Sequence, residues 1–474
     1  MLILVACSHS GPVEESSKPF NVLFIAIDDL NDWTGFLKGH PQAKTPNLDR
    51  LAAESRIFER AYCAVPACNP SRVAIMTGMH ATTTGIYHNP NYMWDSEAIR
   101  NSAITLPKYF SQHGYYTAAK GKLFHHQDGK WAEPDQWDKF EPPSGNRMGK
   151  HPDFSENQLA SGMPADAKRQ RNFDWGSLKV ELEETSDYHI AQFAAEQLSK
   201  AHDKPFFVAA GLFRPHLPWY VPEGYLEQFP LEHIILPDVK VDDLNDIPPV
   251  GIQISSGLKE RSDYQRVKEY GKFKEAVQAY LASIKYADDC LGIILDALDN
   301  SPHKDNTIVV LWGDHGWHLA EKLHYRKFTL WEEAVRVPLL IKVPGMTENG
   351  QPSKRTVSLL DLYPTLTELC GLPQNEKVEG LSLVPMLKDP RASRERPALT
   401  SLQPGRHTVR SEQFRYIRYE DGTEELYDHD TDPMEWHNLA GDRAYEAVKK
   451  EHAKWIPQNI HPAIGEDDNS WKTK

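Results

Sequence analysis

The stretch NVLFIAIDD, residues 21–29, decides the fold class of this chain. After Asn21, six consecutive apolar residues lead to Asp28 and Asp29. A continuous apolar run of this length is typical of a strand that is buried on both faces of a parallel sheet. The two aspartates follow the carboxyl end of this strand, which is the edge of an open α/β sheet where ligands bind.

Strands and helices alternate along the rest of the chain. Further strands are predicted at residues 115–119, 205–212 and 307–312, and helices at 45–55, 106–114, 187–202 and 273–298. The first of these helices has Thr45 as a candidate N-cap and Pro46 at its first position. This alternation predicts an α/β fold, in which a large, mostly parallel sheet is flanked by helices on both faces.

The segments between these elements differ in composition. Residues 129–176 and 237–259 show little periodicity, so we expect long loops there. Near the C-terminus we predict a helix over 357–372 with an irregularity at Pro364, a charged linker over 388–397, and strands over 407–433 with a turn at Asp421-Gly422. We therefore expect three parts: a signal and polar tether (1–20), a main domain (21–390) and a smaller C-terminal α+β domain (391–474).

The N-terminal sequence MLILVACSHSG resembles a bacterial lipoprotein signal, in which Cys7 is lipidated after cleavage. It has no Lys or Arg before its short apolar run, and a truncated gene start would explain both departures from the pattern. No other apolar run is long enough to span a bilayer. We expect an exported protein, periplasmic or on the outer membrane or cell surface, that meets the membrane only through a lipid anchor.

Composition limits the function classes. A net charge of -14 argues against nucleic-acid binding. It does not exclude an anionic substrate, because a few cationic groups in a cleft can focus positive potential locally. The five cysteines are too few and too scattered for a disulfide framework. A redox or metal pair of Cys63 and Cys68 is a weak alternative, because no second cluster accompanies it.

A second informative stretch is CAVPACNPSRVAIMTGMHATTTGIY, residues 63–87. Cys68 opens a predicted helix that ends at Thr77-Gly78. Anions at a helix N-terminus are stabilised by the unpaired N–H groups and the helix dipole. Cys68 is therefore a candidate nucleophile, either as a thiolate or after modification. A small buried residue before a helix is the alternative.

The pattern CNPSR at residues 68–72 resembles the signature of the type I sulfatases of the alkaline-phosphatase superfamily. The resemblance implies an alkaline-phosphatase-like fold and oxidation of Cys68 to formylglycine by a formylglycine-generating or anaerobic maturation enzyme. In that family one hydroxyl of the formylglycine hydrate attacks sulfur, and the second then expels sulfate. Arg72 is expected to stabilise the hydrate or the metal-bound carboxylates.

Asp28 and Asp29 are the first candidates for metal ligands. Adjacent aspartates at a strand end are difficult to bury unless a cation balances them, and oxygen ligands select hard cations. Capping of the next turn is the alternative. Through the resemblance, Asp314 and His315 complete the ligand set, with Ca²⁺ expected and Mg²⁺ as the second choice. The Asp-His pair is similar to that of the iduronate-2-sulfatase-like branch, where many other sulfatases have Asn in place of His315.

The resemblance assigns four further residues to the sulfate: Lys122, His125, His216 and Lys327. Lys122 and His125 have the K-x-x-H spacing of the iduronate-2-sulfatase-like branch, and His126 is an alternative to His125. His216, which lies between two prolines, is a candidate general acid for the leaving alcohol. Arg326 is an alternative to Lys327, and a solvated surface charge is the alternative for each lysine.

The similarity extends from Asn21 to about Asn438. It implies a sulfuric ester hydrolase that acts on a sulfated oligosaccharide or polysaccharide of marine or glycosaminoglycan type. Three alternatives remain: a phosphonate or phosphate monoester hydrolase of the same superfamily, a noncatalytic carbohydrate-binding lipoprotein, and a hydrolase that uses the unmodified Cys68 thiolate. Four side chains after the Asp-His pair either line the pocket or pack in the core: Trp317, His318, His324 and Tyr325.

Overall fold

The computed structural model describes residues 18–126, 129–146, 158–165, 172–256, 262–347 and 349–465. Cys7 and the predicted signal segment lie outside these residues. Parts of the irregular region predicted over 129–176 also lie outside them. No helix in the described part of the chain is both long and apolar enough to cross a membrane.

A nine-stranded mixed sheet forms the centre of the molecule, in the order β11-β2-β12-β8-β1-β6-β3-β4, with β13 also paired to β2. The parallel part comprises β1 (Asn21–Ile27), β3 (Tyr116–Gly121), β4 (Lys139–Glu141), β6 (Phe206–Leu212) and β8 (Thr307–Gly313). The other side comprises β2 (Arg56–Tyr62), β11 (Arg336–Val337), β12 (Leu339–Lys342) and β13 (Pro352–Ser358). Both β11 and β12 run antiparallel to their neighbours. The predicted mostly parallel sheet is confirmed.

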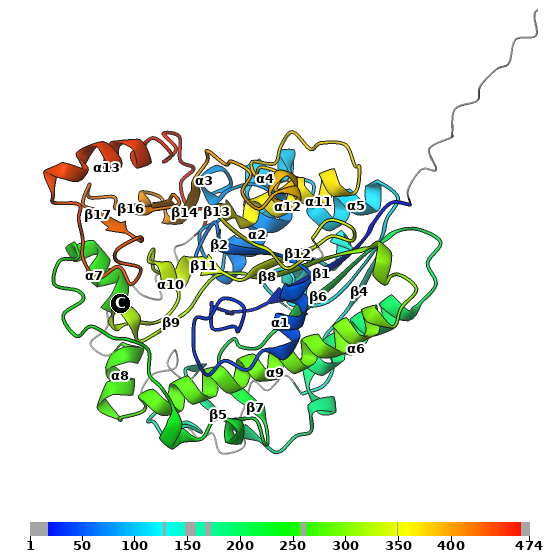
Figure 1. Ribbon diagram of the computed structural model, residues 1–474, viewed down its shortest axis with the longest axis horizontal. Helices are drawn as coiled ribbons and strands as arrows, with labels where there is room; N and C mark the ends of the chain where they lie inside the picture. The colour runs from blue at the N-terminus through cyan, green and yellow to red at the C-terminus, as the bar shows by residue number, and fades with distance from the viewer. Residues whose placement is uncertain are drawn as a thin grey trace, which may run out of the picture.

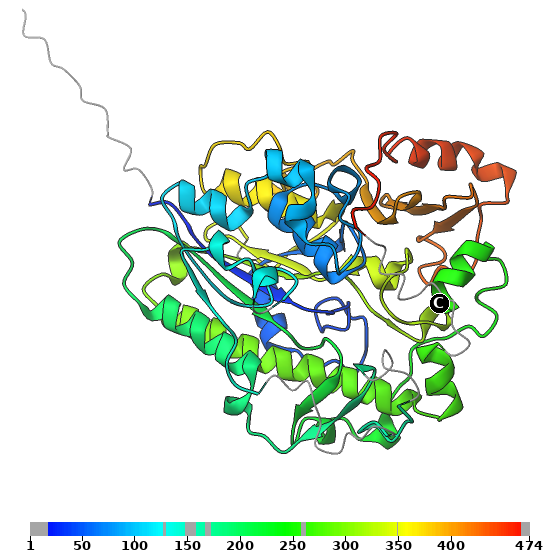
Figure 2. The ribbon, with the colours of Figure 1, turned by 180° about the vertical axis from the view of Figure 1, so that it is seen from behind.

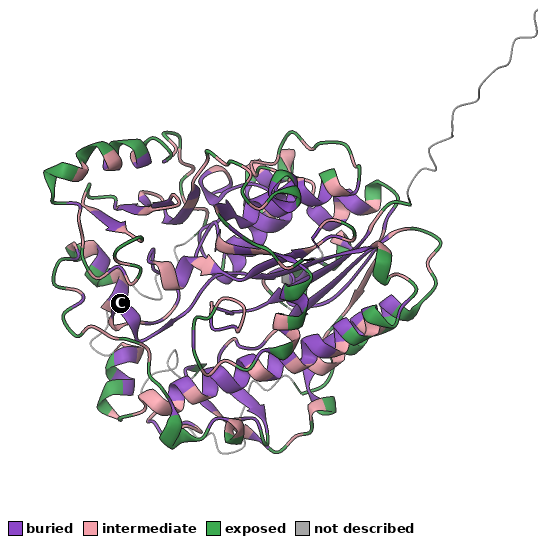
Figure 3. Cartoon of the chain, in the orientation of Figure 1, coloured by how far each residue is buried: buried purple, intermediate pink, exposed green. Residues whose placement is uncertain are grey.

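Helices cover both faces of the sheet. Alternate residues of β1 therefore pack into two hydrophobic cores, one on each face. Leu23, Ile25 and Ile27 belong to one core, and Val22, Phe24 and Ala26 to the other. The first face is covered by α1 (Pro46–Ala53), α6 (Ser186–Ser199) and α9 (Phe273–Asp299) (Figure 1). The second is covered by α2 (Cys68–Thr77), α5 (Leu106–Gln112), α11 (Leu362–Leu369) and α12 (Val384–Lys388). Figure 3 shows the strands of the sheet buried between these layers.

The first predicted helix shows how tertiary contacts replace local capping. Thr45 occupies the N-cap position of α1 as expected, but its Oγ1 accepts a hydrogen bond from Gly35 N (2.8 Å) instead of capping the helix. Asp288 of α9 accepts hydrogen bonds from Asn47 N (3.1 Å) and Leu48 N (2.8 Å). An acidic side chain from another helix therefore satisfies the free N–H groups of α1.

The C-terminal part contains a four-stranded antiparallel sheet: β14 (Ala398–Gln403), β15 (Arg406–Arg410), β16 (Phe414–Arg418) and β17 (Glu424–Asp428). The predicted turn holds Gly422 at φ 84°, a conformation that favours glycine. With α13 (Glu446–Ala453), this sheet lies at one end of the central sheet in both views (Figures 1 and 2). The smaller α+β domain is confirmed, and its boundary at residue 391 stays a prediction.

Three expectations differ from the structure. The long loop predicted over 129–176 includes β4 of the central sheet, so that prediction was wrong there, because tertiary pairing with β3 forms a strand where the sequence has little periodicity. The loop predicted over 237–259 contains α7 (Pro249–Ser256), so that prediction was wrong there. The helix predicted over 357–372 is a 3₁₀ turn at Leu359–Asp361 followed by α11. Pro364 lies in the first turn of α11, where a missing N–H removes no helical hydrogen bond.

Candidate active site

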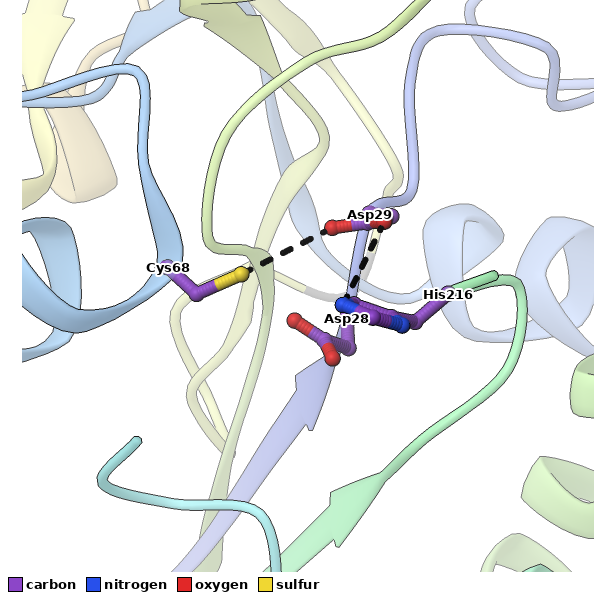
Figure 4. A group of neighbouring side chains, drawn as sticks. All are labelled: Asp28, Asp29, Cys68 and His216. Atoms are coloured by element: carbon purple, nitrogen blue, oxygen red, sulfur yellow. Dashed lines mark hydrogen bonds and ion pairs between the residues drawn. The ribbon is translucent and has the colours of Figure 1, made fainter. Parts of the chain in front are cut away.

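Segments that are far apart in sequence meet at the carboxyl edge of the parallel strands. Asp28 and Asp29 follow β1, Lys122 follows β3, and Asp314 follows β8. The loop after β6 brings His216 to the same place, opposite the start of α2, which carries Cys68 (Figure 4). The sheet edge at which we expect ligands to bind is therefore the place where these segments meet.

Cys68 is the first residue of α2 and its side chain is enclosed by polar groups. Its Sγ lies 2.8 Å from Lys327 Nζ, 3.3 Å from His315 Nε2 and 3.8 Å from Asp29 Oδ1. Cys68 is only 1% exposed, and all ten residues of α2 are buried. The thiol therefore lies among the Lys327 ammonium group, the His315 imidazole and the Asp29 carboxylate at a helix N-terminus, where a negatively charged group is stabilised.

The N-terminus of α2 is fixed from outside the helix. Asn69 N donates to Asn89 Oδ1 (3.0 Å), and Asn69 Nδ2 donates to the carbonyl oxygens of His88 (3.2 Å) and Asn91 (2.6 Å). The next residue, Pro70, has no N–H to satisfy. These contacts hold the backbone beside Cys68 in place, and no sequence pattern indicated Asn89.

The side chain of Arg72, one turn further along α2, contacts residues that follow three different strands. Its Nε donates to Asp314 Oδ2 (2.9 Å) and its Nη2 to Asp28 Oδ1 (3.1 Å), while Nη1 donates to the Lys122 carbonyl. The side chain is fully buried. Burial opposes its charge, but Asp314 and Asp28 outweigh that effect and raise the pKa of Arg72. Arg72 thus contacts two predicted metal ligands rather than Cys68.

The pKa values of Asp28 and Asp29 are shifted in opposite directions. Burial would raise the pKa of Asp28, but Lys122, whose Nζ lies 2.5 Å from Asp28 Oδ2, and Arg72 hold it well below its ordinary value. Burial raises the pKa of Asp29 despite its ion pair with Lys327 (2.6 Å). Asp29 is also in the left-handed region, with φ 60°. Such a conformation in a non-glycine residue often marks a functional site.

The donor set fits a cation. Asp29 Oδ2 is buried and has no hydrogen-bond partner among the described residues. His315 Nδ1 lies 2.9 Å from the Gly316 carbonyl, to which it donates, so the lone pair of Nε2 is available 3.3 Å from Asp29 Oδ1 and 3.6 Å from Asp314 Oδ2. Ligand atoms of Asp28, Asp314 and His315 all lie within 4.8 Å of one another. Such clustered oxygens with one imidazole nitrogen suit a divalent cation.

His216 and His125 lie at the edge of this cluster. His216 Nε2 is 3.9 Å from Asp29 Oδ2, and the side chain is 23% exposed. Its Nδ1 lies 2.6 Å from the Leu217 carbonyl, and Arg214 Nη1 donates to the His216 carbonyl (2.9 Å). The Arg214 side chain therefore positions the His216 loop. His125 is half-buried, and burial and the Lys122 charge hold its pKa well below the ordinary range.

The structure shows which of the two candidates for the second sulfate-binding cation, Lys327 or Arg326, lies at Cys68. Lys327 Nζ lies within 3.2 Å of Asp29, Cys68 and His315. Arg326 instead contacts Asp263 and Asn172, so it is not the residue at Cys68. Trp317, His318 and Tyr325 are buried, and a ring of Trp317 lies 5.4 Å from Lys327 Nζ. Core packing explains these residues, and His324 contacts backbone carbonyls.

A supporting residue without a sequence signal is Tyr280 of α9. Its hydroxyl donates to the Asp29 carbonyl (2.7 Å) and accepts from Asn31 N (3.0 Å). It therefore fixes the backbone at the left-handed Asp29. Cys63 and Cys68 are both free, and none of the candidate metal-binding groups among the described residues contains Cys63, so the structure does not support the alternative of a redox or metal pair.

Comparisons with known proteins identify the families that the chain matches and the proteins to which it is similar. Residues 20–372 match the protein family described as Sulfatase, and residues 313–461 match the one described as N-sulphoglucosamine sulphohydrolase, C-terminal. A protein named sulfatase from Formosa agariphila is 39% identical over 460 residues, which cover 93% of this chain and 88% of that protein. Iduronate 2-sulfatase of Homo sapiens is 30% identical over 416 residues, 78% of this chain and 72% of that protein.

Two solved structures share the fold at low sequence identity. One, determined with its substrate D-glucosamine-2-N,6-O-disulfate, has a TM-score of 0.71 and 21% identity, and the match covers 92% of this chain and 96% of that one. The other, a phosphonate monoester hydrolase from Silicibacter pomeroyi, has a TM-score of 0.76 and 20% identity over 94% and 97% of the two chains. At these identities the likeness concerns the fold alone.

Proposed function

Because this chain belongs to the sulfatase family and is a sulfuric ester hydrolase, we propose that it releases sulfate from a sulfated saccharide with a nucleophile derived from Cys68 and a bound divalent cation. The observation that supports this proposal best is the surrounding of Cys68 Sγ, with Lys327 Nζ at 2.8 Å and the unpaired Asp29 Oδ2 in the same cluster. A nucleophile, two or more cations and a set of oxygen ligands meet at one point.

The nucleophile we propose is formylglycine, formed from Cys68 by a formylglycine-generating or anaerobic maturation enzyme. Its hydrate supplies one hydroxyl for attack on sulfur and a second whose deprotonation releases sulfate from the covalent intermediate. Cys68 opens α2, so its free N–H and the helix dipole face the incoming anion. An unmodified thiolate at this position would attack sulfur but would lack the second hydroxyl.

The cation, Ca²⁺ or Mg²⁺, would be held by Asp28, Asp29, Asp314 and His315, and it would act as a Lewis acid on a sulfate oxygen. Arg72 holds Asp314 and Asp28 in place through its fork of donors. The residues that hold the ion are thus oriented before substrate binds, which is the condition for electrostatic catalysis without reorganisation.

Lys122 and Lys327 carry the positive charge that would offset the charge of the sulfate group in the transition state. Their ammonium groups contact Asp28 and Asp29, the carboxylates that would hold the cation. His125, three residues after Lys122, is proposed to contact the sulfate or the hydrate.

His216 is the proposed proton donor to the leaving alcohol. Its ring is fixed by the Nδ1 contact with the Leu217 carbonyl, and Nε2 is directed at the carboxylate cluster. Its 23% exposure places it on the open side of the cluster, where the alcohol would leave. Its role is therefore to move a proton at the bridging oxygen.

The saccharide class is inferred from the relatives. The Asp314-His315 pair accompanies 30% identity to iduronate 2-sulfatase, and a more distant relative from Formosa agariphila, 27% identical, is named an ulvan-active sulfatase. We propose a substrate among glycosaminoglycan or marine-type polysaccharides. We also propose export of the chain as a lipoprotein anchored through Cys7, which lies outside the described residues.

The test is sulfate release from a panel of sulfated oligosaccharides of the ulvan, heparan, carrageenan and fucoidan types. Cys68→Ala is expected to abolish release, whereas Cys63→Ala, a buried cysteine five residues earlier, is expected to retain it. Mass spectrometry of the peptide that contains Cys68 shows whether formylglycine is present. Equal release by parent and Cys68→Ala would refute the nucleophile.

Three alternatives are tested alongside this panel. Faster turnover of phosphate or phosphonate esters than of matched sulfate esters would favour a phosphonate or phosphate monoester hydrolase, which the shared fold allows. Saccharide binding without hydrolysis by protein that contains formylglycine would favour a noncatalytic carbohydrate-binding lipoprotein. Full activity of the unoxidised thiol form would favour a Cys68 thiolate mechanism.

A further inference from the structure

We propose that Lys322 is a positioning residue for Lys327: it fastens the turn of residues 320–328 to the C-terminal domain and thereby holds Lys327 Nζ beside Cys68. The proposal rests on the function proposed above for Lys327. It gives the C-terminal domain a part in catalysis, although none of the described residues of that domain contacts Cys68.

The turn that carries Lys327 has an unfavourable backbone conformation. It contains no glycine, yet five of its nine residues have positive φ values: Ala320 (100°), Lys322 (52°), Leu323 (49°), Arg326 (82°) and Phe328 (70°). L-residues rarely adopt this region, and they keep it only where the surroundings impose it. The position of Lys327 therefore depends on whatever restrains the turn.

Lys322 provides a restraint from the C-terminal side. Its side chain is 3% exposed, and its Nζ donates to Asp243 Oδ1 (2.9 Å) and to the carbonyl oxygen of Glu435. The ammonium group also lies over the rings of Tyr427 (5.2 Å) and Trp331 (5.7 Å). Tyr427 belongs to β17, so a strand of the small sheet contributes directly to this pocket.

A second set of contacts joins the same turn to α7. Ser255 Oγ donates to the Lys322 carbonyl (2.8 Å), and His324 lies between the carbonyl oxygens of Ser255 (2.7 Å) and Lys327 (3.0 Å). α7 packs on the same apolar cluster as Tyr427 and Trp331, and Figure 1 shows it beside β17. The turn before Lys327 is thus held by α7 and by the C-terminal domain together.

Loss of the Lys322 ammonium would release one end of this turn. Asp243 and the Glu435 carbonyl would lose their buried donor, and the residues with positive φ would relax toward ordinary conformations. Lys327 lies five residues further on, and a displacement of its Nζ of about 1 Å is enough to reduce turnover strongly.

The experiment compares Lys322→Met with Lys449→Met. Lys449 is a matched control, because it is also a buried lysine of the C-terminal region that pairs with a carboxylate, Glu424 (3.0 Å), and donates to a carbonyl, Ala440 (2.8 Å). Hydrogen–deuterium exchange of residues 320–328 is expected to increase in Lys322→Met and to stay unchanged in this segment in Lys449→Met. Unchanged exchange in Lys322→Met would overturn the proposal whatever the substrate.

A double-mutant cycle on sulfate release then tests the path through Lys327. We expect Lys322→Met to lower kcat by about tenfold to a hundredfold. Added to Lys327→Met it should cause no further loss, since a residue that acts only through Lys327 has nothing left to position. Additive losses would overturn the positioning role. Full activity of Lys327→Met would instead refute the role proposed for Lys327, so the two failures are distinguishable.

Discussion

A substitution of Arg72 tests whether its buried guanidinium group stabilises the Asp28 and Asp314 carboxylates of the site. We consider Arg72→Lys, which keeps the positive charge but replaces a planar fork by a single ammonium group. In the native protein, Nε contacts Asp314 and Nη2 contacts Asp28, at 2.9 and 3.1 Å, while Nη1 contacts backbone carbonyls. An ammonium group cannot reach these separate acceptors at once.

The expected loss of stability follows from that geometry. Arg72, Asp28 and Asp314 are all fully buried, so a carboxylate that loses its partner cannot be rescued by water. Breaking a buried ion pair in this way costs about 3–5 kcal/mol in the free energy of unfolding, which for a chain of 474 residues corresponds to a fall in melting temperature of about 3–5 °C. Sulfate release should fall as well, because both carboxylates are proposed metal ligands.

Differential scanning fluorimetry with and without Ca²⁺ measures this effect, and Arg50→Lys is the control. Arg50 pairs with Asp296 and Asp299 at the surface, where its side chain is 40% exposed, so that substitution should change stability by no more than about 1 kcal/mol. Ca²⁺ should restore part of the loss in Arg72→Lys, because it neutralises the same carboxylates. Equal melting temperatures for Arg72→Lys and Arg50→Lys would refute the reasoning.

Three further predictions concern the cation, a buried acid and a close backbone contact. Asp29→Asn should abolish the rise in melting temperature on addition of Ca²⁺, and a rise equal to that of the parent would place the cation elsewhere. Burial raises the pKa of Asp288 to about 6, so the folded state binds this proton more tightly than the unfolded state, and the penalty for the charge is lost as the pH falls from about 6 to 4. The parent should therefore gain about 2–3 kcal/mol in unfolding free energy relative to Asp288→Asn over that interval, as measured by urea unfolding, and a pH-independent difference would contradict the shift. Gly211→Ala would place a Cβ 2.3 Å from the Lys122 carbonyl, so its melting temperature and turnover should fall, whereas Gly441→Ala, with open space around it, should match the parent in both measurements.

The parts of the site that follow apolar strands could be predicted from the sequence. The run before Asp28 and the run before Asp314 identify two buried strands, and the carboxyl-edge rule for parallel sheets then places both aspartates together. Cys68 was identified by the CNPSR pattern, and its predicted place at the start of a helix is confirmed. The chemical roles of these residues stay predictions.

The remaining features depend on tertiary contacts that leave no local pattern. Tyr280 and Asp288 lie within a long amphipathic helix, where spacing alone does not separate a core residue from one that supports Asp29 or caps α1. The sequence around Lys322 is typical of a solvated turn. Its side chain is nevertheless buried in a pocket formed by three other segments. α7 was missed because the surrounding prolines and aspartates are typical of a loop.

The burial of α2 has a consequence for the order of folding and of any modification of Cys68. All ten of its residues are inaccessible, and Cys68 itself has only 1% of its surface exposed. An enzyme that modifies Cys68 would need to bind the neighbouring peptide in its own cleft, which the packed helix does not permit. The modification proposed for Cys68 would therefore have to be completed before α2 packs between the sheet and its neighbouring helices, and a chain that folded earlier would keep its thiol.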